Sequence, residues 1–264
     1  MTAVKDKLVC ITGASSGIGE SLAYAFANEG SRLLLCARNL EKLQQVKAKC
    51  TNASSVHLLQ VDLSKYEEIQ KHFDPVLSEI GDIDILINNA GISQRTTVID
   101  STIDVDKKIM DINYFGLVAL TRYILPSMVK RKSGHMVAIS SVAGYISTSH
   151  RSAYAASKHA VRAWYDSLRS EVFKHNIKVT VICPGYIHTD ITINALNNKA
   201  ESYGKMDTNQ AKGMSADVCA IKIVDTIKAG KSELLVGGKE TRFVLLKRLF
   251  PGLVEKRLRD VIPQ

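Results

Sequence analysis

The chain has 264 residues, of which 45% are hydrophobic and 23% charged, a composition typical of globular proteins. No Pro-, Gly- or Ser-rich linker, internal repeat or low-complexity tract divides it, so we expect a single domain. The net charge of +9 is dispersed and shows no basic motif interleaved with aromatic residues. It therefore indicates a basic surface that attracts an anionic cofactor, and argues against a nucleic-acid interface.

No segment approaches the ~18 consecutive apolar residues that a membrane-spanning helix needs. The first strand-like segment begins at Lys7, so we expect neither a secretory signal nor a membrane anchor before it. The five cysteines show no C-x-x-C pairing, and their odd number argues against a disulfide framework. A cytoplasmic protein with reduced thiols is expected.

Apolar, strand-like segments alternate with longer segments in which apolar residues recur every three or four positions, as in helices. The strand-like segments are 8–13, 32–37, 56–61, 83–88, 135–140, 178–183 and 233–237. Strands without polar alternation, separated by helices, indicate a parallel sheet covered on both faces. Right-handed crossovers then give a doubly wound α/β sheet with ligand sites at the carboxyl ends of its strands.

A glycine-rich turn, "TGASSGIG", follows the first strand and opens the first helix. Gly13, Gly17 and Gly19 have the spacing G-x-x-x-G-x-G, which differs from the G-x-G-x-x-G of the standard dinucleotide fingerprint. Glycines let the backbone approach a pyrophosphate, while the helix N-terminus supplies amide donors and a positive dipole. The turn predicts a phosphate site; a plain helix N-cap at Ser15 or Ser16 would also suit these residues.

The second strand ends in Ala37 and is followed by Arg38. An enzyme selective for NAD usually places Asp or Glu here to bind the ribose 2′-hydroxyl. Without that carboxylate nothing repels a 2′-phosphate, and a guanidinium can bind one through charge-assisted hydrogen bonds. Ser15, in the facing turn, can donate another. We therefore predict NADP(H) as the cofactor in preference to NAD(H).

Polar residues also follow the third and fourth strands. Asp62 can accept a hydrogen bond from an adenine amino group, and Ala90 and Gly91 permit close packing against an adenosine ribose. Asn88 and Asn89 have a simpler interpretation, because asparagines at strand ends often satisfy backbone groups of loops.

Several motifs in this order resemble the short-chain dehydrogenase/reductase family over roughly residues 7 to 237. They are T-G-x-x-x-G-x-G at 12–19, N-N-A-G at 88–91, the serine at 141, Y-x-x-x-K at 154–158 and P-G at 184–185. The resemblance implies a single-domain, Rossmann-like fold with a seven-stranded parallel sheet and helices on both faces. It also implies an NAD(P)-dependent oxidoreductase that forms a homodimer or homotetramer. We take residues 1–238 as the catalytic domain.

The resemblance places the family's catalytic set on Asn113, Ser141, Tyr154 and Lys158. The residues that it implies for cofactor binding are Gly13, Ser15, Ser16, Gly17, Ile18, Gly19, Arg38, Asp62, Leu63, Asn89, Ala90, Gly91, Tyr154, Lys158, Pro184, Gly185, Ile187 and Thr189. No metal is expected, because no histidines show ligand spacing with a supporting carboxylate.

Tyr154 would give a proton to the substrate oxygen in reduction and take one in oxidation, which requires its pKa to fall towards neutrality. Residues four apart share a helix face, so the Lys158 ammonium can lie beside the phenol and favour the phenolate, as would oxidised nicotinamide. Ser141 would hydrogen-bond the substrate oxygen, and Asn113 would hold a water near Lys158. Alone, Y-x-x-x-K favours a core tyrosine and a snorkelling lysine; the other motifs favour catalysis.

Within the family, Arg38, the stretch "SSVAGYI" (140–146) and the basic tail resemble the NADP-dependent branch that contains hydroxysteroid dehydrogenases and carbonyl reductases. We expect interconversion of an apolar ketone (steroid-, retinoid- or lipid-like) and its secondary alcohol. The expected substrate residues are Ser141, Tyr145, Tyr186 and Ile193, with 190–206 as a lid. The alternative is a catalytically silent NADP-binding or scaffolding protein.

The tail, residues 239–264, has seven Lys/Arg and three Asp/Glu, hence a net charge of 7 − 3 = +4. Its apolar residues form a stripe, and Pro251 predicts a division into two short helices. A basic amphipathic helix suits a membrane surface. An oligomer interface or a cover over the substrate pocket is the favoured alternative.

Overall fold

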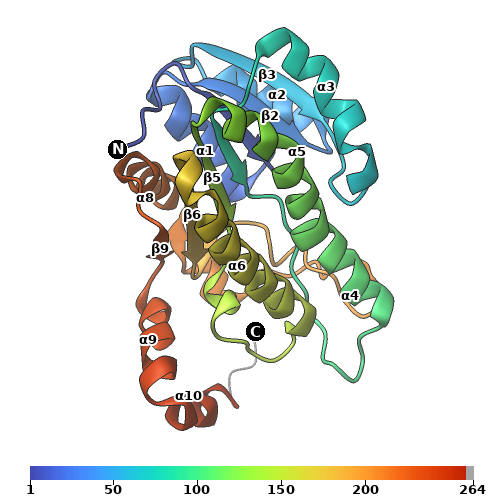
Figure 1. Cartoon of the computed structure of the whole chain (residues 1–264). Helices are drawn as coiled ribbons and strands as arrows, with labels where there is room; N and C mark the ends of the chain where they lie inside the picture. Colours follow the sequence, from blue (N-terminus) through green and yellow to red (C-terminus); the bar gives the residue numbers. More distant parts are fainter. Residues whose placement is uncertain (260–264) are drawn as a thin grey trace.

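A seven-stranded parallel sheet forms the centre of the computed structural model, which describes residues 1–259 (Figure 1). In sheet order its strands are β3 (Ser55–Gln60), β2 (Arg32–Ala37), β1 (Leu8–Thr12), β4 (Ile85–Asn88), β5 (Gly134–Ile139), β6 (Ile177–Pro184) and β9 (Glu233–Val236). Every pairing in this sheet is parallel. The expected doubly wound α/β fold with seven strands is confirmed, each strand lying within a few residues of its predicted segment.

Helices cover both faces of the sheet because alternate side chains of its buried strands enter different cores. Val9 and Ile11 of β1 pack with α1 (Gly17–Asn28), α2 (Leu40–Lys49) and α8 (Ala216–Ala229). Leu8 and Cys10 pack on the other side with α3 (Ile69–Ile80), α5 (Gly116–Arg131) and α6 (Ser152–Val172). Two apolar faces explain why these strands lack the polar alternation of a one-sided sheet.

Most of the shorter elements follow the carboxyl ends of the strands. They are α4 (Ile103–Met110), a π-helical segment (Asp111–Phe115), α7 (Thr208–Ala211), the two-stranded sheet of β7 (Ile187–His188) and β8 (Met214–Ser215), and 3₁₀ turns at Tyr66–Glu68, Val142–Gly144 and Lys239–Thr241. A further 3₁₀ turn, Phe173–His175, leads into the amino end of β6. The sheet order reverses between β1 and β4, so the loops that follow these two strands diverge and leave a crevice between them.

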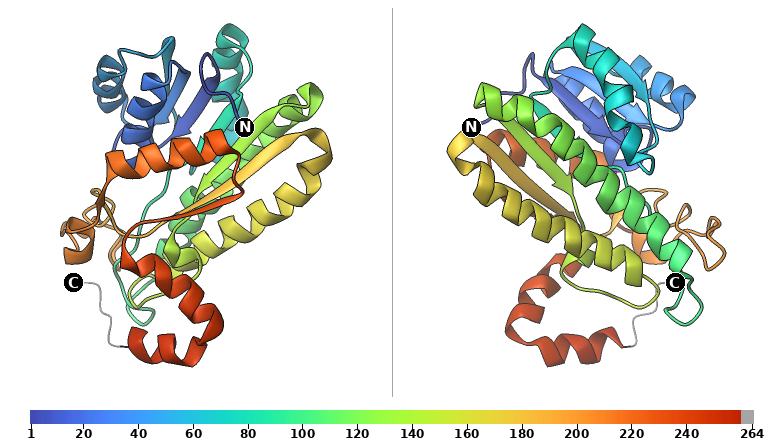
Figure 2. Two further views of the ribbon diagram at one scale, coloured as in Figure 1. Left: turned by 90° about the vertical axis from the view of Figure 1, so that its left-hand side faces the viewer. Right: turned by 45° about the vertical axis from the view of Figure 1, so that its right-hand side comes forward.

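The tail forms two helices, α9 (Arg242–Leu249) and α10 (Pro251–Leu258), which project from the body beyond the end of β9 (Figures 1 and 2). Pro251 opens α10 and separates it from α9, so the predicted division at this proline is confirmed. Residues 260–264 of the predicted tail lie outside the described residues.

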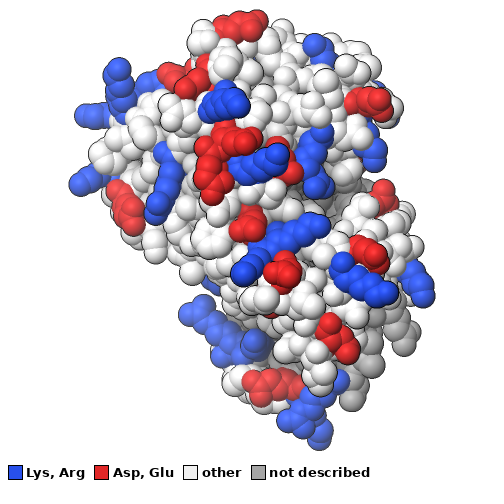
Figure 3. All heavy atoms as spheres, turned by 90° about the vertical axis from the view of Figure 1, so that its right-hand side faces the viewer, with Lys and Arg blue, Asp and Glu red and all other residues white. Residues whose placement is uncertain are grey.

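Charged side chains of both signs are interspersed on the face shown in Figure 3, where no continuous basic area covers several elements. Within residues 1–259, none of the helices combines the length and apolarity needed to cross a bilayer.

A buried hydrogen-bond network supports the end of β4, next to the crevice. The Asn88 Nδ2 donates to the Tyr165 Oη at 2.8 Å and to the Thr121 Oγ1 at 2.9 Å. All three side chains lie in the core. Because Asn88 precedes the loop after β4, this network fixes where that loop begins.

Replacing Tyr165 by Phe should lower the free energy of unfolding by about 1–3 kcal/mol, because the buried Asn88 amide loses an acceptor that no water can replace. Denaturant unfolding of the purified chain measures this change. Tyr66→Phe is the matched control, since the Tyr66 hydroxyl has no hydrogen-bond partner within residues 1–259 and its removal should change stability by less than about 0.5 kcal/mol. Equal stability of both variants would contradict the role given to the network.

Candidate active site

A cavity of about 1270 Å³ opens at the carboxyl ends of the strands. Its walls run from the glycine turn past the ends of β2, β4, β5 and β6 to the lid at 190–206. Pockets for single small ligands measure roughly 300–1,000 Å³, so this cavity has room for a dinucleotide with a substrate beside it.

The glycine turn has the backbone conformation that its residues predict. Gly13 and Gly17 have φ values of +64° and +57°, in the left-handed region that favours glycine. A Cβ on Gly19 would lie 2.2 Å from the Gly13 carbonyl oxygen, so Gly19 lets α1 pack against the turn, and it does not itself line the cavity. Ser16 precedes α1, but its side chain caps no amide of the helix. The plain capping alternative is therefore not what Ser16 does.

Side-chain hydrogen bonds clamp the glycine turn to the loop after β4. The Thr12 Oγ1 accepts hydrogen bonds from the amides of Asn89 and Ala90, each at 3.0 Å. The Asn89 Nδ2 donates to the carbonyl oxygens of Thr12 at 2.9 Å and Gly13 at 3.3 Å. The Asn89 side chain therefore satisfies backbone carbonyl groups of a loop, as the simpler interpretation of this asparagine expects. The residue also lines the cavity.

The end of β2 presents positive charge to the cavity and no carboxylate. Arg38 is exposed and lines the cavity together with Ser15 and Lys42. Asp62, after the neighbouring strand β3, lines the cavity as well, and its Oδ1 accepts hydrogen bonds from the amide and hydroxyl of Ser64 at 3.0 and 2.8 Å. Arg38, Lys42 and Ser15 fit an anionic, phosphate-bearing ligand at this end of the cavity.

Three residues of the predicted catalytic set line the far part of the same cavity: Ser141, Tyr154 and Lys158. Tyr154 lies in the first turn of α6, and the Lys158 Nζ is 5.9 Å from the centroid of its ring. The Lys158 Nζ donates to the Ile139 carbonyl oxygen at 2.9 Å. The Ser141 Oγ accepts a hydrogen bond from the Ala143 amide at 3.1 Å. The spacing of four residues thus places tyrosine and lysine on one side of the helix.

Asn113, the fourth residue of that set, is fully buried in the π-helical segment and does not line the cavity. Its Oδ1 accepts from the Ile92 amide at 2.8 Å, and its Nδ2 donates to the Ile92 carbonyl oxygen and the Ser157 Oγ, each at 3.0 Å. A Cβ on Gly91 would lie 3.2 Å from the Asn113 Oδ1 and 3.3 Å from the Lys158 Nζ, so glycine at this position avoids crowding both side chains. The water expected beside Asn113 stays a prediction.

Burial dominates the titration of both reactive side chains. It lowers the pKa of Lys158 to about 8, which lets this lysine exchange a proton near neutral pH. It raises the pKa of Tyr154 above its usual value, although the interaction with the Ser141 side chain and the charges of Arg151 and Arg95 act in the opposite direction. The chain's own groups therefore do not bring the pKa of Tyr154 towards neutrality, and the expected fall in the presence of oxidised nicotinamide stays a prediction.

The predicted substrate residues divide into two groups. Ser141 and Tyr186 line the cavity, whereas Tyr145 and Ile193 do not. The Tyr145 hydroxyl donates to Glu233, and its ring lies 3.8 Å beneath the Arg162 guanidinium, so this side chain is held at the outer edge of the sheet. The Ile193 carbonyl oxygen accepts from the Ser202 hydroxyl and the Gly204 amide, which stabilises the fold of the lid.

Sequence reasoning did not identify Arg95 and Arg151, two arginines that also line the cavity. The one available signal was the position of Arg151, three residues before Tyr154 and hence on the same side of α6. Within residues 1–259, no group of three or more His, Cys, Asp and Glu side chains could hold a metal ion.

Comparisons with known proteins agree with this geometry. The short chain dehydrogenase family model matches residues 7–200. Dehydrogenase/reductase SDR family member 7B of Mus musculus is 44% identical over 256 residues, which cover 95% of this chain and 79% of that protein.

Solved structures share the whole fold. A short-chain dehydrogenase from Streptomyces avermitilis superposes with a TM-score of 0.80 at 27% identity, over 95% of this chain and 96% of that one. A short chain dehydrogenase/reductase from Burkholderia phymatum in complex with NAD has a TM-score of 0.83 at 23% identity, over 100% and 99% of the two chains. The chain therefore belongs to the short-chain dehydrogenase/reductase family of nicotinamide-dependent oxidoreductases.

Proposed function

We propose that the protein is an NADP(H)-dependent oxidoreductase that interconverts a carbonyl group and a secondary alcohol, with Tyr154 as the acid and base. The observation that carries this proposal is that one cavity joins the glycine turn and Arg38 to Ser141, Tyr154 and Lys158. A catalytically silent binding protein would not need a complete set of catalytic residues beside the cofactor site.

The chain's residues supply orientation and the proton. The bound nicotinamide supplies the hydride in reduction and accepts it in oxidation. Ser141 and Tyr154 donate hydrogen bonds to the substrate oxygen, and Tyr154 gives up its proton as the C=O double bond becomes a C–O single bond. The phenolate then regains a proton from solvent through Lys158, whose pKa of about 8 suits that exchange. Oxidation runs through the same steps in reverse.

The preference for NADP(H) rests on the charge at the end of β2. Arg38 and Lys42 both line the cavity, and Ala37 and Arg38 stand at the end of β2 where an Asp or Glu would repel a 2′-phosphate. Ser15 in the glycine turn lines the same part of the cavity, and its hydroxyl can donate to a phosphate oxygen.

An apolar ketone or secondary alcohol is the proposed substrate class. Val142, Ile146 and Leu196 line the catalytic part of the cavity, and Phe243 and Leu258 of the tail extend that wall. The contribution of the tail supports its interpretation as a cover over the substrate pocket.

The outer side of the tail exposes apolar side chains: Leu245, Leu249, Phe250 and Leu253 are each at least 57% accessible. We propose that this side contacts another copy of the chain in a homodimer or homotetramer. A membrane surface is the competing partner, because Lys and Arg residues flank the same side chains.

Tyr154→Phe should reduce turnover by at least about 10²-fold while NADPH still binds, because the ring keeps its packing and only the transferable proton is lost. Steady-state NADPH oxidation with a panel of ketones measures turnover, and fluorescence titration measures binding. Tyr203→Phe, in the lid and outside the cavity wall, is the control and should keep full activity. Turnover by Tyr154→Phe within a few-fold of the parent would exclude the tyrosine as the acid.

Arg38→Glu should weaken NADPH binding by roughly tenfold to a hundredfold, because a charge-assisted hydrogen bond contributes about 1.5–3 kcal/mol and the new carboxylate repels the phosphate. NADH binding should change much less. Lys47→Glu makes the same charge change on the exposed side of α2, outside the cavity wall, and should leave both affinities unchanged. An unaltered NADPH/NADH ratio in Arg38→Glu would refute the cofactor assignment.

Replacing both Phe250 and Leu253 by Ser should reduce the molar mass found by light scattering, because the apolar contact between subunits is weakened. Phe173→Ser removes a side chain that is 83% exposed on another part of the surface, and should leave the mass unchanged. If the double variant keeps its mass but no longer floats with anionic vesicles, the tail binds membrane and the subunit interpretation is wrong.

A further inference from the structure

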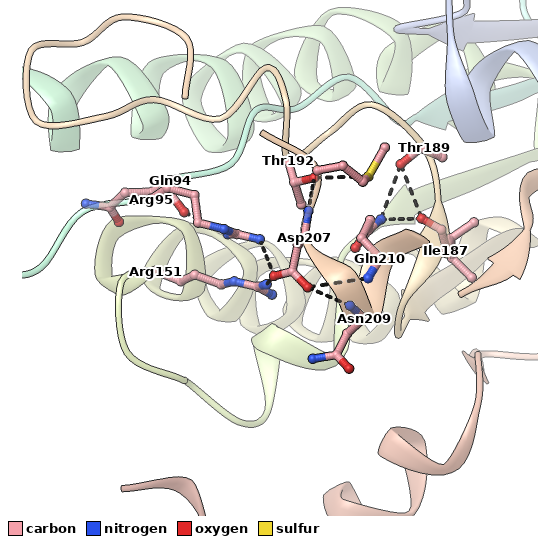
Figure 4. Close-up of polar contacts among 10 residues, drawn as sticks. Gln94, Arg95, Arg151, Ile187, Thr189, Thr192, Asp207, Asn209 and Gln210 are labelled. Atoms are coloured by element: carbon pink, nitrogen blue, oxygen red, sulfur yellow. Dashed lines mark hydrogen bonds and ion pairs between the residues drawn. The ribbon is translucent and has the colours of Figure 1, made fainter. Parts of the chain in front are cut away.

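Two arginines of the cavity wall, Arg95 and Arg151, form a buried cluster with Asp207 (Figure 4). The Asp207 Oδ2 lies 3.1 Å from the Arg95 Nη2 and 3.1 Å from the Arg151 Nη2. The Arg95 and Asp207 side chains are 2% and 1% exposed, and that of Arg151 is 13% exposed. The cluster joins the loop after β4, the residue before α6 and the residue that precedes α7.

The charges in this cluster do not balance, because one carboxylate faces two guanidinium groups. Arg95 also donates from Nη1 to the Gln94 carbonyl oxygen at 2.9 Å, but the Nε atoms of both arginines are buried without a partner within residues 1–259. Burial and the charge of Arg151 lower the pKa of Arg95 to about 10, so it stays protonated at neutral pH. A surplus positive charge is therefore held in the cavity wall, an arrangement that is unfavourable for stability alone.

The surplus charge acts on Tyr154. Arg151 lies one helical turn before it, and Arg95 lines the same cavity. The other groups around the phenol are Lys158 on α6, Ser141 after β5 and Cys183 on β6, and Lys108 of α4 lines the cavity as well. Burial raises the pKa of Tyr154. The two arginines and the interaction with Ser141 oppose this effect, whereas Cys183 adds to it.

We propose that Arg95 and Arg151, held in place by Asp207, are positioning residues that stabilise the Tyr154 phenolate formed when the tyrosine transfers its proton. The inference rests on the proposed role of Tyr154 and adds a source for the positive charge that this role requires. The arginines contact neither the proton nor the hydride; they act through the electrostatic potential at the phenol oxygen.

Asp207, the residue directly after the lid, completes this cluster and also begins α7. The Asp207 Oδ1 accepts from the Asn209 and Gln210 amides at 2.9 and 3.4 Å, so the same side chain organises α7. The Gln210 Nε2 donates to the Ile187 carbonyl oxygen and, at 3.3 Å, to the Thr189 Oγ1 (Figure 4). Thr189 is a predicted cofactor residue, so one short segment connects the cofactor side of the cavity to the arginines beside Tyr154.

Arg95→Gln tests the inference through the pH profile of alcohol oxidation, measured as kcat/KM with NADP⁺. Oxidation needs the phenolate, so its rate rises with pH through the pKa of Tyr154. Losing a nearby cation raises that pKa, and the acid limb should move to higher pH by about one unit, equivalent to a tenfold loss of rate well below the limb. Arg95→Lys keeps the charge and should restore most of the profile.

Arg122→Gln, which removes an exposed arginine from α5, is the matched control and should leave the limb unmoved. A rate that falls equally at every pH in Arg95→Gln would assign the cluster a purely structural role and overturn the inference. If Arg95→Gln does not fold, the less buried Arg151→Gln decides by the same criterion.

A second readout separates this inference from the proposed function. Ultraviolet difference titration follows the Tyr154 phenolate as the signal present in the parent and absent in Tyr154→Phe, without any turnover. Arg95→Gln should raise the midpoint of that signal by about one pH unit. An unchanged midpoint would overturn the inference even if the enzyme is active, whereas a protein without oxidoreductase activity would refute only the proposed function.

Discussion

The hydrogen bonds of Thr12 are the constraint on which the rest of the site depends. The sheet order reverses between β1 and β4, so the loops that follow these strands leave in different directions. Thr12 accepts two amides of the β4 loop, and Asn89 returns two hydrogen bonds to the glycine turn. These hydrogen bonds join the two loops directly after their strands, so the base of the cavity between them is rigid. The upper walls of the cavity come from longer segments.

The upper walls hold charges that the protein has little reason to bury unless they act on a ligand. Lys158 loses its hydration and gains one carbonyl acceptor, and Tyr154 is buried where its phenolate is unfavourable. Burial of Lys158 or of Tyr154 alone lowers the stability of the fold. Together they form a site in which fixed dipoles and charges, and not mobile water, surround the proton that is transferred. The same low dielectric that makes these groups unfavourable strengthens their effect on the reacting atoms.

The sequence predicted those features in which short-range pattern and long-range packing agree. Strands such as Leu8–Thr12 are apolar throughout because both of their faces are buried, and Pro251 cannot continue α9 because it lacks an amide hydrogen. Tyr145 was misjudged, since its direction is set by Glu233 and Arg162, which no local pattern connects to it. The Arg95–Asp207 pair spans 112 residues, and neither neighbourhood carries a motif that would reveal the contact.

The segment 190–212, which contains the lid and α7, shows why such contacts matter for an assembled site. Its sequence is polar and weakly patterned, yet Asp207 and Gln210 are buried, because each satisfies backbone amides or carbonyls and also reaches a functional segment. A lid held by apolar contacts alone could close in several similar positions, whereas buried hydrogen bonds and ion pairs accept only one. With Asp207 out of place, two cations would face each other without a counterion, so the packed position of the lid and the charge around Tyr154 are fixed together.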